Sequence, residues 1–292
     1  MKPSRWYENS RFIELDGQRL FVHEQGEGPV LLCLHGIPGA SWSWHKLLPE
    51  LTGFRVIAPD LLGFGHSDKP GDARYSVVAH SDRMEALLAA LSIKDFHLMG
   101  QGVGAMIATE LLARAEGRLA EERDPRINPL SLFLINAPVF PELSETPQAE
   151  QWLSGRLGEL LKFVATRAHF WQYLNRISGP YSRPTPTEAG HLWKLMLRHE
   201  GRWLLPAHAR YHKELMKRGK RWVRTLRDTE RPVRLVAGPE DPIAGHRLEA
   251  AFRRSLPALR REMIGKLGHL PQLEAPNKLL PLIEAFHEEI SV

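Results

Sequence analysis

The sequence predicts an α/β fold with a mostly parallel sheet, helices on both faces of that sheet and an inserted helical cap. Short apolar runs that fit buried strands alternate with stretches in which apolar residues recur at helical spacing, a pattern typical of parallel sheets. Between residues 138 and 229 the strand-like runs disappear and only helical patterns remain. The chain of 292 residues is long enough for one sizeable domain that carries such an insertion.

Alternating strands and helices are predicted in residues 1–137, which we expect to form the first part of the core. Continuous apolar runs, which suit strands buried on both faces, occupy residues 30–34, 55–60, 96–99 and 130–135. Helices are predicted where large apolar residues recur at helical spacing, over residues 41–51, 79–91 and 103–115. Strands and helices that alternate in this way pack as a sheet with helices on both faces.

The cap is predicted over residues 138–229, and residues 230–292 complete the core, with strands near 233–237 and 262–264. A stretch that contains Gly and Pro, residues 178–184, divides the helices of the cap. A helical block between two strands of a parallel sheet is best placed over the carboxyl edge of the strands, where open α/β folds bind ligands. A second independent domain is the alternative, but the same strand pattern returns on both sides of the insertion.

Composition excludes several classes of protein. No apolar run approaches the roughly 20 residues of a membrane-spanning helix, and no apolar stretch follows the basic first residues as it does in a signal peptide. We therefore expect a soluble, cytoplasmic protein. Cys33 is the single cysteine, which excludes an intramolecular disulfide and a cysteine-based metal cluster. Its apolar neighbours predict a small buried hydrophobe.

Much of the net charge of +5 arises between residues 194 and 234. Such a basic segment could favour an anionic surface or an acidic ligand, but a solvated helix exterior is the better interpretation. Neither a nucleic-acid-binding module nor an interleaved aromatic platform accompanies the charge, so we expect no nucleic-acid partner. The expected partner is a small-molecule substrate or ligand, and the sequence leaves the oligomeric state open.

The central chemical signal is Gly100-Gln101-Gly102-Val103-Gly104, placed directly between a predicted strand and a predicted helix. This is the context of a nucleophile elbow, G-x-Nu-x-G, in which small flanking residues permit a very tight turn. The central residue, Gly102, has no side chain, so the turn is expected to survive while the attacking atom is missing. A dinucleotide-binding turn is the alternative, but the spacing is G-x-G-x-G rather than G-x-G-x-x-G, and we expect no cofactor.

Two further residues lie where a hydrolase with such an elbow needs an acid and a base. Asp241 and His269 each follow a predicted strand, so the order nucleophile, acid, base is kept along the chain. Asp241 is expected to fix the tautomer of the His269 imidazole. The loop 35–39, His-Gly-Ile-Pro-Gly, matches an oxyanion loop, and the backbone N–H groups of Ile37 and Val103 are expected to converge on a developing negative charge.

These motifs resemble the epoxide hydrolase and haloalkane dehalogenase branch of the α/β-hydrolases, and most closely the mesoderm-specific transcript-like proteins. The resemblance runs nearly end to end, through HGIP at 35–38, VIAPDLLGFGHSDKP at 56–70, GPYSRP at 179–184, RWV at 221–223, GPEDP at 238–242 and LPQLE at 270–274. It implies the α/β-hydrolase fold. In the similar proteins an aspartate at the position of Gly102 attacks an electrophilic carbon, and water activated by the histidine releases the product.

The resemblance also implies roles for residues around the elbow. Dehalogenases of this branch hold the halide with a side chain in the oxyanion loop and with a Trp after the nucleophile, whereas this chain has Ile37 and Val103 there, which disfavours dehalogenation. Epoxide hydrolases use cap tyrosines to protonate the epoxide oxygen. The candidates for substrate binding are Tyr181, which lies in the best-matched motif, together with Tyr173, Tyr211, His35 and Gln101.

Three functions remain open for a chain with Asp241 and His269 but with Gly102 between strand and helix. The first is an altered hydrolase, in which His269 activates a water above Gly102 or takes a proton directly from a small, mostly apolar substrate. The second is a ligand-binding protein without turnover, and the third is an inactivated variant of a hydrolase with an aspartate nucleophile. Because both other residues are retained, we favour retained chemistry, and we expect neither a metal nor a cofactor. General-base catalysis alone supplies about 10²–10⁴-fold, so the substrate must be reactive.

Overall fold

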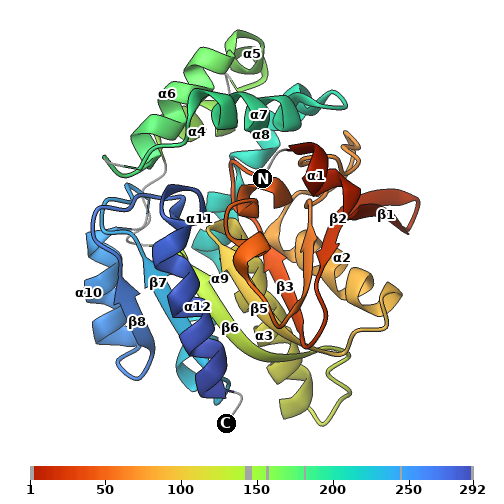
Figure 1. The fold of residues 1–292 in the computed structure, drawn as a ribbon, viewed down its shortest axis with the longest axis vertical. Coiled ribbons are helices and arrows are strands. Elements are labelled where there is room, and N and C mark those ends of the chain that lie inside the picture. Colours follow the sequence, from red (N-terminus) through yellow and green to blue (C-terminus); the bar gives the residue numbers. More distant parts are fainter. Residues whose placement is uncertain (1–2, 142–146, 156–157, 181, 244, 291–292) are drawn as a thin grey trace.

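The computed structural model describes residues 3–141, 147–155, 158–180, 182–243 and 245–290. A twisted sheet lies at the centre of the molecule (Figure 1). Its strands in the described residues are β1 (Ser10–Leu15), β2 (Gln18–Gln25), β3 (Val30–Leu34), β4 (Arg55–Pro59), β5 (Asp95–Gln101), β6 (Asn128–Ile135), β7 (Val233–Ala237) and β8 (Arg260–Met263). They are ordered β1-β2-β4-β3-β5-β6-β7-β8; β2 is antiparallel to β1 and β4, and the other pairs are parallel. The predicted fold class, α/β with a mostly parallel sheet, is confirmed.

Helices cover both faces of this sheet (Figure 1). One face carries α2 (Val77–Ala90), α3 (Val103–Ala120), α9 (Tyr211–Asp228) and α10 (His246–Ser255). The other carries the 3₁₀ turns η1 (Ser41–Trp44) and η2 (Leu48–Glu50) and the helices α11 (Pro271–Glu274) and α12 (Pro276–Ile290). Alternate residues of β3 enter two hydrophobic clusters, Leu32 and Leu34 the first, Leu31 and Cys33 the second. β3 is therefore buried on both sides, which its continuous apolar run predicts.

Most helices between β6 and β7 gather over one edge of the sheet (Figure 1). They are α4 (Gln148–Ser154), α5 (Gly158–Val164), α6 (Arg167–Ile177), α7 (Pro186–Leu197), η3 (Gly201–Leu204) and α8 (Leu205–His208), and we call this group the cap. α9 belongs to the same segment of the sequence, but it packs against α3 on a face of the sheet. The segment thus divides into a part over the strand ends and a part that joins the core. Among the described helices, none is long and apolar enough to cross a membrane.

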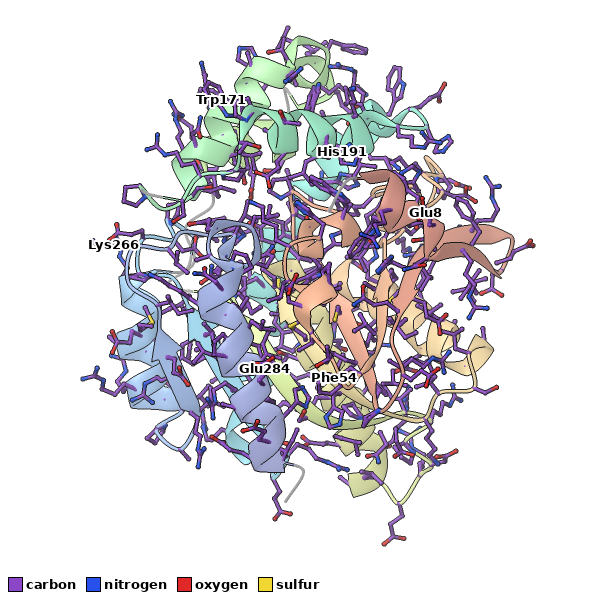
Figure 2. All side chains as sticks on the ribbon, in the orientation of Figure 1. Glu8, Phe54, Trp171, His191, Lys266 and Glu284 are labelled. Atoms are coloured by element: carbon purple, nitrogen blue, oxygen red, sulfur yellow. The ribbon has the colours of Figure 1, made fainter. Side chains whose placement is uncertain are left out.

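The N-terminal helix α1 (Pro3–Glu8) connects the core to the cap. The hydroxyl oxygen of Tyr7 lies 2.8 Å from Nε2 of His191 on α7. Figure 2 shows His191 where the cap meets the core, while Trp171 lies on the outer side of the cap. Trp6 stacks on His23 of β2, with ring centroids 3.6 Å apart. This short helix therefore packs on the sheet through Trp6 and contacts the cap through Tyr7.

Two parts of the fold differ from the expectation. The hairpin of β1 and β2 was not predicted from the sequence. β1 is a half-exposed edge strand, and polar residues interrupt its apolar pattern. Residues 41–51 form the two turns η1 and η2 instead of one helix. Pro49 lies inside η2 and has no backbone N–H, so a continuous α-helix over these residues would lack its hydrogen bond to residue 45. The apolar residues of this stretch are nevertheless buried, which explains their helix-like spacing.

Candidate active site

The turn between β5 and α3 is very tight. Gly102 has φ 55° and ψ −117°, a conformation that residues with a side chain rarely adopt. A Cβ on Gly104 would lie 2.1 Å from the carbonyl oxygen of Leu34, so only glycine fits there. The N–H of Gly102 donates to the carbonyl oxygen of Ile135 at 3.0 Å, which fixes the turn to the end of β6. The chain thus has elbow geometry, with a residue that lacks a side chain at its tip.

Asp241 and His269 lie beside this turn, on the loops that follow β7 and β8. Nδ1 of His269 is 2.9 Å from Oδ2 of Asp241, and both side chains are buried. The other carboxylate oxygen of Asp241 accepts the N–H of Ile243 at 2.9 Å, which fixes the carboxylate. With Nδ1–H donating to Asp241, Nε2 of His269 carries the lone pair of the ring, and the side-chain amide of Gln101 lies 3.3 Å from it. That nitrogen faces the elbow, because a Cβ on Gly102 would lie 3.3 Å from it.

The charges around His269 favour a basic imidazole. Burial lowers the pKa of His269, but the negative charge of Asp241 and its hydrogen bond act in the opposite direction. The carboxyl groups of Glu150 and Glu274 add to this effect, and the net result is a raised pKa. A raised pKa strengthens the imidazole as a proton acceptor.

Two side chains near the strand ends hold the His269 loop. Gln101 donates from Nε2 to the carbonyl oxygen of His269 at 2.8 Å. Asn136, directly after β6, donates from Nδ2 to the carbonyl oxygen of Gly268 at 2.8 Å and accepts the N–H of Gly238 at 2.9 Å. The loops that carry the acid and the base are therefore tied to each other through one buried amide. Gln101, a substrate-binding candidate from the sequence, contacts the histidine loop.

Glu274 is a third side chain that supports the His269 loop, and it also reaches the cap. Its carboxylate accepts the backbone N–H groups of Gly268 at 2.8 Å and of Leu270 at 2.9 Å, on either side of His269. It also accepts the N–H of Gly179, between α6 and α7, at 2.9 Å. One buried carboxyl group thus fixes the base and the junction of the cap at the same time.

The loop after β3 approaches the elbow from the other side. Val103 is the first residue of α3, so its N–H has no acceptor within the helix. Ile37 lies on the loop and lines a cavity under the cap. His35 supports the loop from below: its Nδ1 is 2.9 Å from the carbonyl oxygen of Gly36, and its Nε2 accepts the N–H of Leu61 at 3.0 Å. His35 is fully buried and lies outside the lining of the cavity, so its place is behind the loop.

The cavity has a volume of about 690 Å³ and lies between the cap and the loops of the core. On the core side it is lined by Ile37, Pro38 and Pro242, the residue after Asp241. Its cap wall is mostly apolar and includes Leu153, Leu161, Val164, Phe170, Trp193 and Met196. A cavity of this size and lining suits a small, mostly apolar molecule.

The family of the chain follows from comparison with known proteins. The family described as alpha/beta hydrolase fold matches residues 29–276. The chain belongs to the alpha/beta hydrolase fold family. It is 30% identical to the mesoderm-specific transcript protein of Mus musculus over 283 residues, which are 93% of this chain and 83% of that protein.

Solved structures share the fold of this alpha/beta hydrolase. The haloalkane dehalogenase DatA from Agrobacterium tumefaciens C58 superimposes with a TM-score of 0.80 at 20% identity, over 96% of each chain. The epoxide hydrolase CorEH superimposes with a TM-score of 0.72 at 16% identity, over 96% of this chain and 99% of that chain. At these identities the likeness extends to the fold alone.

Two of the candidate tyrosines of this alpha/beta hydrolase meet at one carboxyl group. Tyr173 on α6 donates to Oε1 of Glu150, and Tyr211 donates to Oε2 at 2.8 Å. Tyr173 lines the cavity, and Tyr211 is buried. Tyr181, the first candidate from the sequence, lies outside the described residues. Glu150 was not expected at the site, because no motif marks it and a glutamate in a short amphipathic helix usually faces solvent.

Proposed function

We propose that this alpha/beta hydrolase hydrolyses a small, mostly apolar substrate by direct attack of a water molecule that His269 activates, without a covalent bond to the enzyme. The observation that carries the proposal is the position of Nε2 of His269, 3.3 Å from the place of a Cβ on Gly102. The base therefore faces the point at which an elbow would present its nucleophile. Gly102 offers no attacking atom there, so water is the remaining nucleophile.

In the proposed reaction, Nε2 of His269 takes a proton from water as the water oxygen attacks an electrophilic carbon. Asp241, 2.9 Å from Nδ1, stabilises the imidazolium that forms. The N–H groups of Val103 and Ile37 are the proposed donors to the negative charge that develops on the carbonyl oxygen of an ester substrate. General-base catalysis supplies about 10²–10⁴-fold, so the substrate must have a reactive carbon–oxygen bond, as an epoxide or an activated ester has.

The lining of the site supports this substrate class over a haloalkane. Ile37 and Val103 have aliphatic side chains, which offer no hydrogen bond to a leaving halide. The apolar cap wall favours a substrate with a hydrocarbon body.

The proposal is tested with styrene oxide and 4-nitrophenyl acetate as probes. We expect His269→Gln and Asp241→Asn to lower kcat/KM by about 10²-fold or more. His199→Gln, at an exposed histidine of the segment between α7 and η3, serves as the matched control and should leave the rate unchanged. A single turnover of styrene oxide in ¹⁸O-labelled water should place the label in the diol at once, because no enzyme carboxylate supplies the oxygen.

An unlabelled diol in the first turnover would reject direct water attack. Tight binding of the probes by folded protein without any turnover would instead support the alternative of a ligand-binding protein that has lost catalysis.

A further inference from the structure

Three elements of the structure converge on the carboxyl group of Glu150. It is 6% exposed and lies on α4, in the wall of the cavity. Each of its oxygens accepts a phenol hydrogen bond, from Tyr173 on α6 and from Tyr211 at the start of α9. A carboxyl group on a cap helix is usually solvated, whereas this one is buried and held at both oxygens. Such a placement fixes the direction of the group as well as its position.

Glu150 lies across the cavity from the core loops that carry Ile37 and Asp241. Ile37 and Pro242 line this cavity from the core, and Glu150 and Tyr173 line it from the cap. The carboxyl group is close enough to the imidazole to raise the pKa of His269 when it is ionised, after the larger effects of burial and of Asp241. A substrate that reaches from the cavity to the elbow would therefore meet the base on the core side and this carboxyl group on the cap side.

The surroundings of Glu150 favour its protonated form. Burial raises the pKa of Glu150, and the like charge of Asp241 acts in the same direction. The two phenol hydrogen bonds and His269 act against this shift, but the net result is a raised pKa. The titratable and charged groups that face this carboxyl group or share its cavity wall are Tyr173, Tyr211, His269, Asp241, His169, Arg176 and His208.

We propose that Glu150 is a second catalytic residue of this site, the general acid that protonates the leaving oxygen of the substrate while His269 deprotonates the attacking water. This assignment rests on the proposed function, because it needs a substrate bound between the dyad and the cap. It gives Glu150 the role that the resemblance implies for a cap tyrosine, which is to protonate the epoxide oxygen. The two candidates Tyr173 and Tyr211 donate their hydroxyl hydrogens to Glu150. Burial raises the pKa of each phenol well above the usual range.

The reaction balances with these two groups alone. The water oxygen forms a bond to the electrophilic carbon, and the bond between that carbon and the leaving oxygen breaks. The electron pair of the broken bond takes the proton of Glu150, and the proton of the attacking water passes to Nε2 of His269. Glu150 is left as a carboxylate, which the two phenol donors stabilise. Exchange with solvent after product release returns the proton from His269 to Glu150.

Two probes with different leaving groups test whether Glu150 protonates the leaving oxygen or only supports the structure of the site. The oxygen of styrene oxide needs a proton as the ring opens, whereas 4-nitrophenolate leaves from 4-nitrophenyl acetate without one. We expect Glu150→Gln to lower kcat/KM for styrene oxide by about 10²-fold or more and for the ester by less than about threefold. His269→Gln should lower both rates. Glu159→Gln, at an exposed glutamate of the cap, is the matched control and should change neither.

The pH profile gives a second readout. Since an acid works only in its protonated form, the wild-type rate with styrene oxide should fall as the pH rises through the pKa of Glu150, and Glu150→Gln should lose this limb. Infrared spectra at neutral pH provide a third readout that needs no turnover. The wild type should show the carbonyl band of a protonated carboxylic acid that Glu150→Gln lacks.

Each result decides between the proposals. An equal loss with both probes in folded Glu150→Gln, or no loss with either, overturns the assignment of Glu150 as the acid, as does the absence of the infrared band. Retained rates in His269→Gln reject the proposed function instead. If the wild type turns over neither probe, both the proposed function and the catalytic role of Glu150 are rejected, even if the band is present.

Discussion

The side-chain amide of Gln101 touches His269 at two points. Its Nε2 lies 2.8 Å from the carbonyl oxygen of His269 and 3.3 Å from Nε2 of the imidazole. Gln101 directly precedes Gly102, so the elbow and the base are held at a fixed distance from each other. The second contact is directed at the lone pair that the proposed mechanism uses. Gln101 therefore positions the base and also competes with water for it.

Replacement of this amide should separate the two effects. Gln101→Leu leaves the carbonyl oxygen of His269 without its buried donor, so we expect a loss of about 1–3 kcal/mol in the free energy of unfolding. Activity should fall about 10- to 100-fold, because the imidazole is no longer held against the elbow. Urea unfolding and kcat with 4-nitrophenyl acetate measure the two effects. A faster enzyme of unchanged stability would indicate that competition for the lone pair outweighs positioning.

A side chain at the elbow should be costly. Gly102 has φ 55°, and its Cβ would lie 3.3 Å from Nε2 of His269, so Gly102→Ala strains the backbone and pushes on the base. We expect a loss of about 1–3 kcal/mol in the free energy of unfolding, measured by urea denaturation. Gly117→Ala is the matched control in α3: no atom of the described residues outside its own turn of helix lies within 4 Å of its Cβ. That change should stabilise by about 0.5–1 kcal/mol. Equal effects of the two substitutions would contradict the strain at Gly102.

The contact between cap and core should depend on pH. Glu188, at the start of α7, lies 2.6 Å from Nζ of Lys46 in the core. Burial raises the pKa of Glu188, but hydrogen bonds from His45, Lys46 and Thr185 outweigh it and give a pKa well below the usual range. A lowered pKa stabilises the folded state above the unfolded pKa of 4.5, and this stabilisation is lost as the pH falls through the folded pKa.

We therefore expect Glu188→Gln to cost roughly 1 kcal/mol at neutral pH, because the pair is partly exposed and screened. The difference from the wild type should shrink as the pH falls below 4.5, because Glu188 of the unfolded chain takes up a proton there before the folded protein does. Urea unfolding of both proteins at pH 7 and at acidic pH checks this. A difference that stays constant with pH would show that the charge of Glu188 has no part in holding the cap.

Sequence motifs predicted the elbow, Asp241 and His269 as neighbours, because each lies on the segment that follows a strand of the parallel part of the sheet. The carboxyl ends of such strands meet at one edge, so the sequence order also predicts neighbours in space. Spacing could not predict Glu274, whose carboxylate joins the His269 loop to Gly179, a residue far away in the chain. Such a contact depends on how the cap docks, which no local pattern determines.

Glu150 illustrates the same limit. The sequence marks Tyr173 and Tyr211 as candidates through resemblance, but their common partner lies on a third helix and in no motif. Only the packing of α4, α6 and α9 brings the three groups together. The secondary structure was predicted well where strands are buried on both faces. It was predicted poorly for β1, because an edge strand has a weak apolar pattern.

A carboxylate at the elbow should give the chain a covalent mechanism. Gly102→Asp places a nucleophile beside His269 and close to Gly36, on the loop of Ile37. The backbone must keep φ near 55° with a side chain, at a cost of about 1–3 kcal/mol. Because the new Cβ would lie 3.3 Å from Nε2, the imidazole must also move by a few tenths of an ångström. The variant is therefore expected to be less stable than the wild type but folded.

Intact-protein mass spectrometry after incubation with styrene oxide tests the new chemistry. The wild type should form no adduct on residues 100–104, because Gly102 has no attacking atom. Gly102→Asp should form an ester, which water activated by His269 hydrolyses slowly. The double variant Gly102→Asp, His269→Gln should accumulate that ester, and Gly102→Asn, of equal size without the charge, should form none. A folded Gly102→Asp that is neither alkylated nor active would place the reacting carbon away from the elbow, and water attack above Gly102 would lose its geometric basis.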